Sequence, residues 1–543
     1  MTTEALTLAP PGTPSAVLDD AHLGDIRGAL GTINVHDLAP RRTWRARVLT
    51  LLAIMGPGLI VMVGDNDAGG VATYAQAGQN YGTSLLWTLF LLIPVLIVNQ
   101  EMVVRLGAVT GVGHARLIIE RFGKFWGAFS VGDLFILNFL TIVTEFIGVS
   151  LAASYLGVSP YVAVPTAALL LIAITITGSF RRWERFMFVF LAASVIIVPF
   201  AVMSHPDSGT LAHDTLVPGI QGGISSDAVL LIIAIVGTTV APWQLFFQQS
   251  NVIDKRITPR WLHYERADTV IGAVVVILGA AVIMGASAHL FAGSSLAGQF
   301  SDAGGVAQGL SDLGGHTLGV IFAIILLDAA IIGASAVTLA TSYAFGDVFS
   351  TRHSLHRRFR DAKLFYGTYT AMAAAAAAIV LVPNAPLGVM TTAVQALAGV
   401  LLPSATVFLV LLCNDKAVLG PFVNRPWLNV VASVIVSVLL MLSAILTVTT
   451  LIPGIDVAKL SLALGAALAV ALTAFGALML RRREPSVAVA DGDRATWRMP
   501  PLSTLERPVW SRGRVVAMFA LRGYLVVAAV LLAIKGVQLA TGH

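Results

Sequence analysis

The sequence predicts an all-α integral membrane protein in which two of the membrane-crossing helices are interrupted. Of its 543 residues, 57% are hydrophobic and only 12% are charged, and the mean hydropathy is +0.84. A soluble domain carries roughly 25% charged residues, so this chain has too few to cover a soluble globule of its size. Apolar segments of about twenty residues, enough to cross ~30 Å of hydrocarbon, recur along the chain, and two contain helix-breaking residues.

Composition also excludes several other classes of protein. Cys413 is the only cysteine, so a disulfide-stapled secreted scaffold is excluded. Neither C-x-x-C nor H-E-x-x-H occurs, which removes those metal-site motifs. The net charge of +5 is typical of the inner loops of a membrane protein and does not require a nucleic-acid partner.

Residues 1–47 are polar and predict a cytoplasmic tail with a short surface helix. No basic segment followed by a short apolar core begins the chain, so a signal peptide is not expected. Twelve apolar spans follow, with approximate limits 50–79, 83–106, 126–153, 160–178, 184–203, 226–251, 268–292, 317–345, 365–383, 388–413, 427–452 and 460–480. A thirteenth segment, 514–536, carries Arg522 at mid-length and is read either as a span or as an interfacial helix.

Loop charges orient these spans. With the N-terminus in the cytoplasm, the outer loops 204–225 and 293–316 contain no Lys or Arg. The inner loops contain most of the basic residues, among them Arg116, Arg121, Lys124, Arg181, Arg182, Arg185, Lys255, Arg256, Arg260, Arg352, Arg357, Arg358, Arg360, Lys416, Arg425 and Arg481. This is the positive-inside pattern of a multi-pass protein of the cell membrane.

The first span contains Gly64-Asp65-Asn66-Asp67-Ala68-Gly69-Gly70. A charged side chain at mid-membrane costs at least ~2.5 kcal/mol, and each glycine weakens a helix by ~1 kcal/mol. We therefore expect a helix that stops, unwinds and restarts where protein or water can satisfy its polar groups.

The sixth span contains a second break, Gly237-Thr238-Thr239-Val240-Ala241-Pro242-Trp243-Gln244, in which Pro242 removes a backbone donor. The two breaks lie five spans apart. Interrupted helices at corresponding positions of two halves indicate the binding site of a transporter, where unwound carbonyls face a cation.

Several motifs, taken in order, resemble the NRAMP family of divalent-metal transporters. The resemblance covers about residues 50–450 and rests on Gly56-Pro57-Gly58, Thr73-Tyr74-Ala75-Gln76-Ala77-Gly78, Arg105-Leu106-Gly107-Ala108, Glu145-Phe146-Ile147-Gly148 and Asp415-Lys416-Ala417-Val418-Leu419-Gly420-Pro421-Phe422. It implies a LeuT-like inverted-repeat fold with discontinuous helices 1 and 6. The transport core is expected over residues 48–453, with about eleven spans, and residues 454–543 would add C-terminal helices and a basic linker.

The metal-site motifs depart from the family pattern. The first-helix Asp-Pro-Gly-Asn is Asp67-Ala68-Gly69-Gly70, and the sixth-helix Met-Pro-His is Ala241-Pro242-Trp243. The family's third-helix aspartate falls on Ile142, and its tenth-helix glutamine falls on Gln395. These changes resemble the NRAMP-related magnesium transporter branch.

The substitutions agree with magnesium chemistry. Soft thioether ligands favour transition metals, whereas Mg²⁺ prefers oxygen ligands and keeps several waters. We expect Asp67 to supply the charge and Gly70 to leave room for water. The family resemblance implies that the carbonyls of Thr238 and Ala241 supply neutral oxygens, and Gln395 would complete the shell or hold a water. Coordination alone does not exclude Mn²⁺ or Ca²⁺.

Other polar residues have two readings each. Asp65 either attracts cations or caps the half-helix, and Glu145 and Asp328 either carry protons or pair structurally. Gln395 is either a ligand or an interhelical hydrogen-bonding group. Further candidates for lining the ion pathway are Asn138, Thr141, Trp243 and Gln244.

The resemblance places the family's proton route on Trp243 and Ile142, which do not titrate. We therefore predict divalent-cation transport without obligatory proton symport. The alternatives are a proton-coupled Mn²⁺/Fe²⁺ carrier, an amino-acid and sodium transporter of the same fold, or a non-transporting metal sensor. No acid/base or nucleophile arrangement indicates an enzyme, and no cofactor is expected. The expected partners are the transported ion and the lipid bilayer, and a monomer is plausible.

Overall fold

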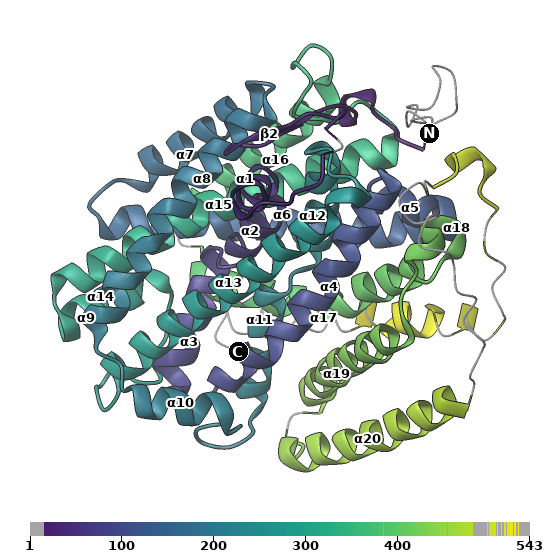
Figure 1. Ribbon diagram of the computed structural model, residues 1–543. Coiled ribbons are helices and arrows are strands. Elements are labelled where there is room, and N and C mark those ends of the chain that lie inside the picture. Colours follow the sequence, from purple (N-terminus) through teal and green to yellow (C-terminus); the bar gives the residue numbers. More distant parts are fainter. Residues whose placement is uncertain are drawn as a thin grey trace.

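A computed structural model describes residues 16–481, apart from 38, 384 and 453, and most positions between 497 and 530. The described chain is a bundle of helices with one small two-stranded ribbon (Figure 1). Nine helices are long and apolar enough to cross a membrane within this part, or ten if the bent pair α1–α2 counts as one span. The prediction of an all-α membrane protein is confirmed.

Helices occupy each of the twelve predicted spans. The first span consists of α1 (Trp44–Ile54), α2 (Pro57–Val63) and α3 (Ala68–Tyr81), and the sixth of α11 (Ser226–Thr239) and α12 (Pro242–Asp254). The others are α4 (Leu86–Thr110), α6 (Lys124–Tyr155), α7 (Pro160–Ile176), α8 (Phe180–Ala193) with α9 (Ile197–Ser204), α13 (Leu262–Phe291), α15 (His316–Phe349), α16 (Lys363–Val380), α17 (Leu387–Cys413), α19 (Pro426–Leu451) and α20 (Val457–Arg481). Shorter helices connect them: α5 (His114–Phe122), α10 (Ser208–Leu216), α14 (Ala303–Gly314) and α18 (Lys416–Leu419).

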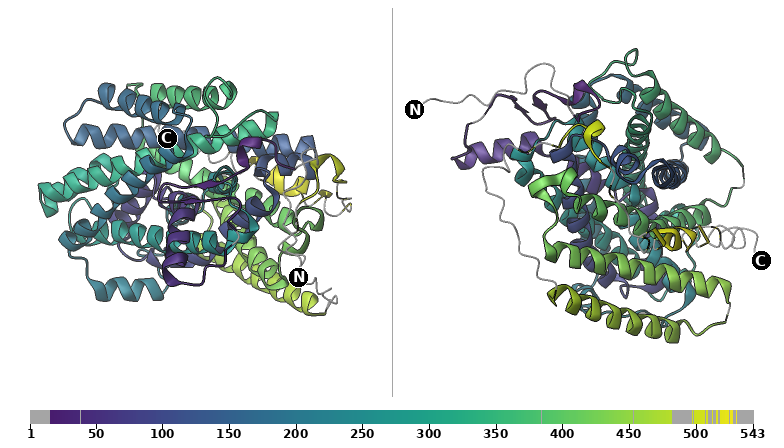
Figure 2. Two further views of the ribbon diagram at one scale, coloured as in Figure 1. Left: turned by 45° about the horizontal axis from the view of Figure 1, so that its top comes forward. Right: turned by 90° about the vertical axis from the view of Figure 1, so that its right-hand side faces the viewer.

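The broken helices lie inside the bundle, where long helices surround them. α3 packs against α13, α11 and α6, and α11 packs against α17. The α11–α12 segment is buried throughout its most apolar stretch, whereas that of α20 has no buried residue. α19 and α20 lie side by side at the edge of the bundle (Figures 1 and 2). The surrounding helices therefore shield the unwound backbone from lipid.

The N-terminal region differs from the predicted tail. From residue 16 onward it folds onto the bundle, with a 3-10 turn (η1, Asp20–His22) and the antiparallel strands β1 (Ile26–Arg27) and β2 (Thr32–Ile33). The ribbon packs against α1, which begins before the predicted boundary at residue 47 (Figure 1). Ile26 and Ile33 are buried there, which explains why these residues are ordered rather than solvated.

The predicted segment 514–536 lies partly outside the described residues, as does the basic linker of residues 484–513. Within the described part, Arg522 is buried and its Nη1 lies 2.7 Å from Oδ2 of Asp133 on α6. Its guanidinium also lies over the rings of Phe129 and Phe408, 4.6 and 5.0 Å from their centroids. The charge at mid-length is thus paired inside the protein.

A candidate ion site between two broken helices

The first break joins α2 to α3 through residues 64–67. The amides of Asp65 and Asn66 donate to the carbonyls of Met62 and Val63 at 3.1 Å, which closes α2 with a tight turn. Asp67 has an extended backbone and precedes α3 as its N-cap, and its Oδ1 accepts a hydrogen bond from the Gly70 amide at 2.6 Å. The interruption predicted for this span is confirmed.

The second break separates α11 from α12 at Val240 and Ala241. Pro242, the first residue of α12, has no N–H, so the carbonyl of Thr238 lacks the donor that a continuous helix would supply. The carbonyl of Ala241 accepts from the Gln244 amide at 3.2 Å. The predicted break is therefore confirmed, and it leaves the Thr238 carbonyl without its regular helical donor.

The two breaks face each other. Thr238 Oγ1 donates to Asp67 Oδ1 at 3.4 Å, and the hydroxyls of Tyr74 and Thr239 lie 2.8 Å apart. All four side chains are buried. The start of α3 and the end of α11 thus form one polar interface inside the bundle.

Glu145 brings a second carboxylate to this interface. It lies on α6, and its Oε2 accepts a hydrogen bond from the Ala68 amide at 3.1 Å, next to Asp67. Gly333 on α15 permits this approach, because a Cβ there would overlap Glu145 Oε2 and lie 2.9 Å from the Asp67 Cβ. From the sequence, Glu145 was a possible ion-site, pathway or structural residue. Its place at the helix N-terminus depends on packing of α6 against α3.

The predicted ligand residues gather at the breaks. A Cβ at Gly70 would lie 2.9 Å from the Asp65 carbonyl and 3.0 Å from Thr238 Oγ1, so Gly70 lies between the two segments. A Cβ at Gly69 would overlap Nε2 of Gln395, a nitrogen that makes no hydrogen bond within the described chain. Ala241 lies at the other end of the second break, as the N-cap residue of α12.

Asp65 is the other unusual group at the site. Its side chain is fully buried, and neither carboxylate oxygen has a hydrogen-bond partner among the described residues. Asp67 is the N-cap of α3, so Asp65 does not cap this half-helix.

Four other predicted lining residues have partners elsewhere. Asn138 Nδ2 donates to Thr341 Oγ1 at 3.0 Å, and Thr141 Oγ1 donates to its own helix at the Leu137 carbonyl. Gln244 Oε1 accepts from Gln100 Nε2 at 3.0 Å. Asp328 Oδ2 accepts from Ser194 Oγ at 2.5 Å, near the start of α9. The contacts of Asn138, Gln244 and Asp328 connect different helices, that of Thr141 lies within α6, and none of the four reaches the Asp67 carboxylate.

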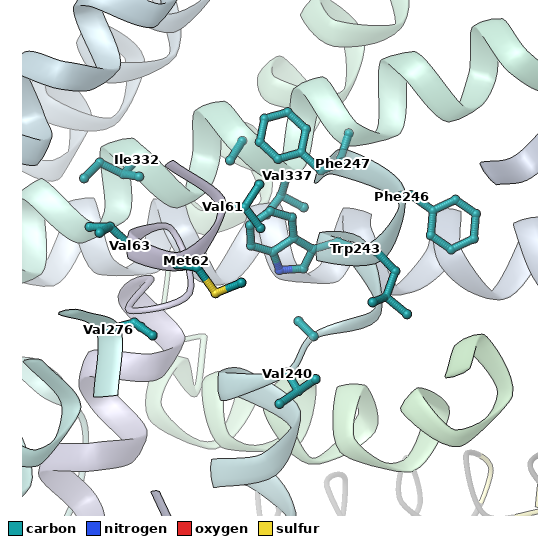
Figure 3. Packing of buried hydrophobic residues seen from close by; sticks show 14 of the residues in the cluster. Val61, Met62, Val63, Val240, Trp243, Phe246, Phe247, Val276, Ile332 and Val337 are labelled. Atoms are coloured by element: carbon teal, nitrogen blue, oxygen red, sulfur yellow. The ribbon is translucent and has the colours of Figure 1, made fainter. Parts of the chain in front are cut away.

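At the start of α12, Trp243 packs among apolar side chains beside the second break. Figure 3 shows its indole among Val61, Met62, Phe247 and Val337. It is fully buried, its ring centroid lies 5.9 Å from that of Phe247, and Nε1 makes no hydrogen bond within the described chain.

The space beside the breaks is small. A cavity of about 10 Å³ borders Ala68, Gly148 and Asp302, and one of about 20 Å³ borders Asp133, Pro242 and Phe246. Each holds about one water molecule. Neither cavity is large enough for an ion with several waters, because α6, α15 and α17 pack closely onto the broken helices. Within the described residues, no three His, Cys, Asp or Glu side chains form a metal-binding group.

Comparison with known proteins gives consistent results. The family described as "Natural resistance-associated macrophage protein-like" (Nramp) matches residues 58–449. The divalent metal cation transporter MntH of Aeromonas hydrophila is 27% identical over 415 residues, covering 73% of this chain and 96% of its own. MntH of Ralstonia nicotianae is 29% identical over 399 residues, covering 70% and 87%. A crystal structure of the Eremococcus coleocola manganese transporter, in complex with an aromatic bis-isothiourea substituted compound, shares the fold, with a TM-score of 0.61 at 20% identity, over 85% of this chain and 99% of that chain.

Proposed function

Because this chain belongs to the Nramp family, we propose that it carries divalent metal cations across a membrane, using the two broken helices as the binding site. It is a transporter of the multi-pass membrane class rather than an enzyme. Relatives that match most of its length are named as divalent metal cation transporters. The chain spans nearly the whole length of these relatives, so the comparison concerns the complete transport core.

One observation carries this proposal: a buried carboxylate on the first break meets oxygen groups of the second. Thr238 Oγ1 lies 3.4 Å from Asp67 Oδ1. The Thr238 carbonyl lacks its regular helical donor because residue 242 is proline. Carboxylate and carbonyl oxygens are ligands of hard divalent cations. A cation here would also offset the charge that Asp67, Glu145 and Asp65 concentrate inside the bundle.

We propose further that Mg²⁺ is the preferred ion, with Mn²⁺ also accepted. The break segments 64–70 and 237–244 contain no methionine or cysteine, and Ala241 stands where the family resemblance places a methionine. Without a thioether, the site loses the ligand that favours transition metals. Since Mg²⁺ retains several waters, transport of the hydrated ion requires a more open conformation than the closely packed one described here.

Proton symport is not part of the proposed mechanism. Trp243 and Ile142, at the positions that the resemblance assigns to the proton route, do not titrate. The membrane potential supplies a sufficient driving force, because two charges crossing ~100 mV gain about 4.6 kcal/mol. The proposed location is the cell membrane, with a cytoplasmic N-terminus as the loop charges predict.

The test is ion uptake by proteoliposomes that contain the purified full chain. Uptake of Mg²⁺, Mn²⁺ and Ca²⁺ should be measured at one membrane potential, for the wild type and for Asp67→Ala. We expect Mg²⁺ uptake that Asp67→Ala abolishes. The exposed Asp361 gives a matched control, because Asp361→Ala removes the same group from a loop and should leave uptake unchanged.

Different results separate the parts of the proposal. Undiminished uptake by Asp67→Ala would remove the site assignment, and no uptake of any ion by the wild type would favour a sensor. Uptake of Mn²⁺ without Mg²⁺ would overturn the proposed selectivity. A pH dye inside the vesicles tests the coupling, since acidification in fixed proportion to ion entry would demonstrate proton symport.

A further inference from the structure

A cationic cavity lies away from the ion site, between the beginnings of α1 and α13. Its volume is about 400 Å³. Residues from the N-terminal segment, α1, the turn before α13 and α13 itself line it: Ala39, Pro40, Arg41, Arg47, Arg260, Trp261, His263 and Tyr264. Three arginines and two aromatic rings around one cavity form a recognisable anion-binding chemistry.

Two of the three arginines, Arg47 and Arg260, are held in place without a carboxylate partner. Arg260 donates to the Ala39 carbonyl at 3.2 Å, and Arg47 donates to the Arg41 carbonyl at 3.1 Å. Neither has a carboxylate within ion-pairing distance among the described residues, whereas Arg41 pairs with Asp37 at 2.6 Å. The guanidinium groups of Arg41 and Arg260 both lie over the Trp261 ring, 5.2 and 4.9 Å from its centroid. Hydrogen bonds to carbonyls orient Arg47 and Arg260, and the Trp261 ring also orients Arg260, without cancelling their charge.

The cavity is the polar end of an exposed apolar stripe. On α13, His263, Val270, Ile271 and Val274 share one helix face, at spacings of three, four and seven residues. The exposed fractions of Val270, Ile271 and Val274 are 41, 39 and 44%. In a chain that crosses a membrane, such a face contacts acyl chains.

α1 also exposes large apolar side chains. Leu49 is 66% exposed and Trp44 is 75% exposed, the latter next to the arginines as expected for an aromatic side chain at the headgroup level. α1 packs against α13, so the two helices flank the same cavity. A ligand that fills both regions has an anionic head and an apolar tail.

We propose that this cavity binds the phosphate headgroup of an anionic phospholipid, whose acyl chains lie along α1 and α13. Arg47 and Arg260 contact the phosphate, and the Trp261 and Tyr264 rings flank the glycerol region. The lipid holds the first turn of α1 to the beginning of α13, whereas the bend of 55° between α1 and α2 lies at the other end of α1. This proposal does not depend on which ion is transported.

The test is native mass spectrometry of the full chain in detergent with added phosphatidylglycerol or phosphatidylcholine of identical acyl chains. We expect the wild type to retain phosphatidylglycerol preferentially. The double variant Arg47→Gln/Arg260→Gln should lower the phosphatidylglycerol affinity by roughly tenfold or more, because each basic residue near an anionic headgroup contributes substantially. Arg352→Gln removes an exposed arginine elsewhere and should keep the wild-type preference.

Two further arms make the result decisive. Arg260→Lys keeps the charge and should keep most of the preference, which separates a lost binding group from a misfolded protein. Equal retention of phosphatidylglycerol by the wild type and the double variant would overturn the proposal. Displacement of the lipid by millimolar inorganic phosphate would also overturn it, because the cavity would then be a site for soluble phosphate.

Discussion

Glu145 and Asp67 share the N-terminus of one buried half-helix. Glu145 Oε2 accepts from the amide of Ala68, and Asp67 Oδ1 accepts from the amide of Gly70, at 3.1 and 2.6 Å. The amides of the first helical turn and the helix dipole make this end of α3 favourable for negative charge. The carboxylates are thereby stabilised in position before any cation arrives. The same two hydrogen bonds therefore cap α3 and hold both carboxylates at the candidate ion site.

The variant Asp67→Asn should separate the two roles of this residue. Asparagine is as good an N-cap as aspartate, so the bond to the Gly70 amide should persist and stability should change by less than about 1 kcal/mol. The negative charge is lost, so we expect divalent-cation uptake to fall at least about tenfold. Uptake by proteoliposomes and thermal unfolding measure the two effects. Loss of both stability and uptake would instead indicate that Asp67 acts mainly as a cap.

Gly237→Ala should destabilise the protein strongly. A Cβ at residue 237 would overlap the carbonyl oxygen of Gln395 and the amide nitrogen of Gly399, and neither backbone group can move aside without shifting α17. Overpacking of this kind costs about 1–3 kcal/mol. Gly465→Ala on α20 is the matched control, since no atom lies within 4 Å of its Cβ and alanine favours helix. Thermal unfolding of the purified variants should therefore shift in opposite directions, and equal shifts would contradict the proposed close contact.

Docking of the N-terminal segment should be strongest near pH 6.5. Burial lowers the pKa of His22 below its ordinary value of 6.5, despite the nearby Asp254 carboxylate. Burial also opposes the charge of His353, but the hydrogen bond and charge of Asp347 raise the pKa of His353 overall. The contribution of His22 is lost as pH falls below 6.5, and that of His353 is lost as pH rises above it. The Arg357 partner holds Asp19 ionised throughout, because against burial it lowers the pKa of Asp19 to about 2.

Hydrogen exchange of residues 20–33 measures this docking. Protection should peak near pH 6.5, after correction for the intrinsic exchange rate, and decline on both sides. In His353→Gln the decline on the alkaline side should disappear while the acid side remains. Protection that rises steadily from pH 5 to pH 8 in the wild type would contradict the assignment of opposite signs to the two histidines.

Arg522 should hold the C-terminal helical segment against α6. Arg522→Gln leaves Asp133 without its partner inside the bundle, and we expect a loss of about 1–3 kcal/mol, since Asp133 remains 28% exposed. The double variant Asp133→Asn/Arg522→Gln removes both charges and should recover part of that loss. Unfolding of the two variants gives the comparison. Equal stability of the single and double variants would show that Asp133 is solvated rather than paired.

Much of the fold could be predicted from the sequence because membrane insertion imposes strong local rules. Length and apolar composition located each of the twelve helical spans, and Gly64 to Gly70 together with Pro242 located both interruptions. The boundaries of the N-terminal region were less predictable. Ile26 and Ile33 do not stand out among the other apolar residues of this region, and only the contacts of the two strands with α1 explain the ribbon that they form.

The candidate site was predictable only in part. Asp67, Gly70 and Thr238 lie on the breaks, which the local sequence located, and the family resemblance pointed to the Thr238 carbonyl. Glu145 was left with an open role, because its approach to Ala68 depends on helix α6 and on the missing side chain of Gly333. Asn138 and Asp328 are also polar residues within predicted spans, but in the structure Asn138 bonds to Thr341 and Asp328 bonds to Ser194.

The sequence by itself determined that this chain crosses a membrane, where its helices break, and that the break residues themselves, 64–70 and 237–244, contain no sulfur. These properties follow from residue hydropathy, from the missing N–H of proline and from the donor atoms of each side chain. Tertiary structure alone decided which polar groups meet and how little space remains between them. The reason is that residues far apart in the chain, such as 67, 145, 238 and 333, come together only when their helices pack.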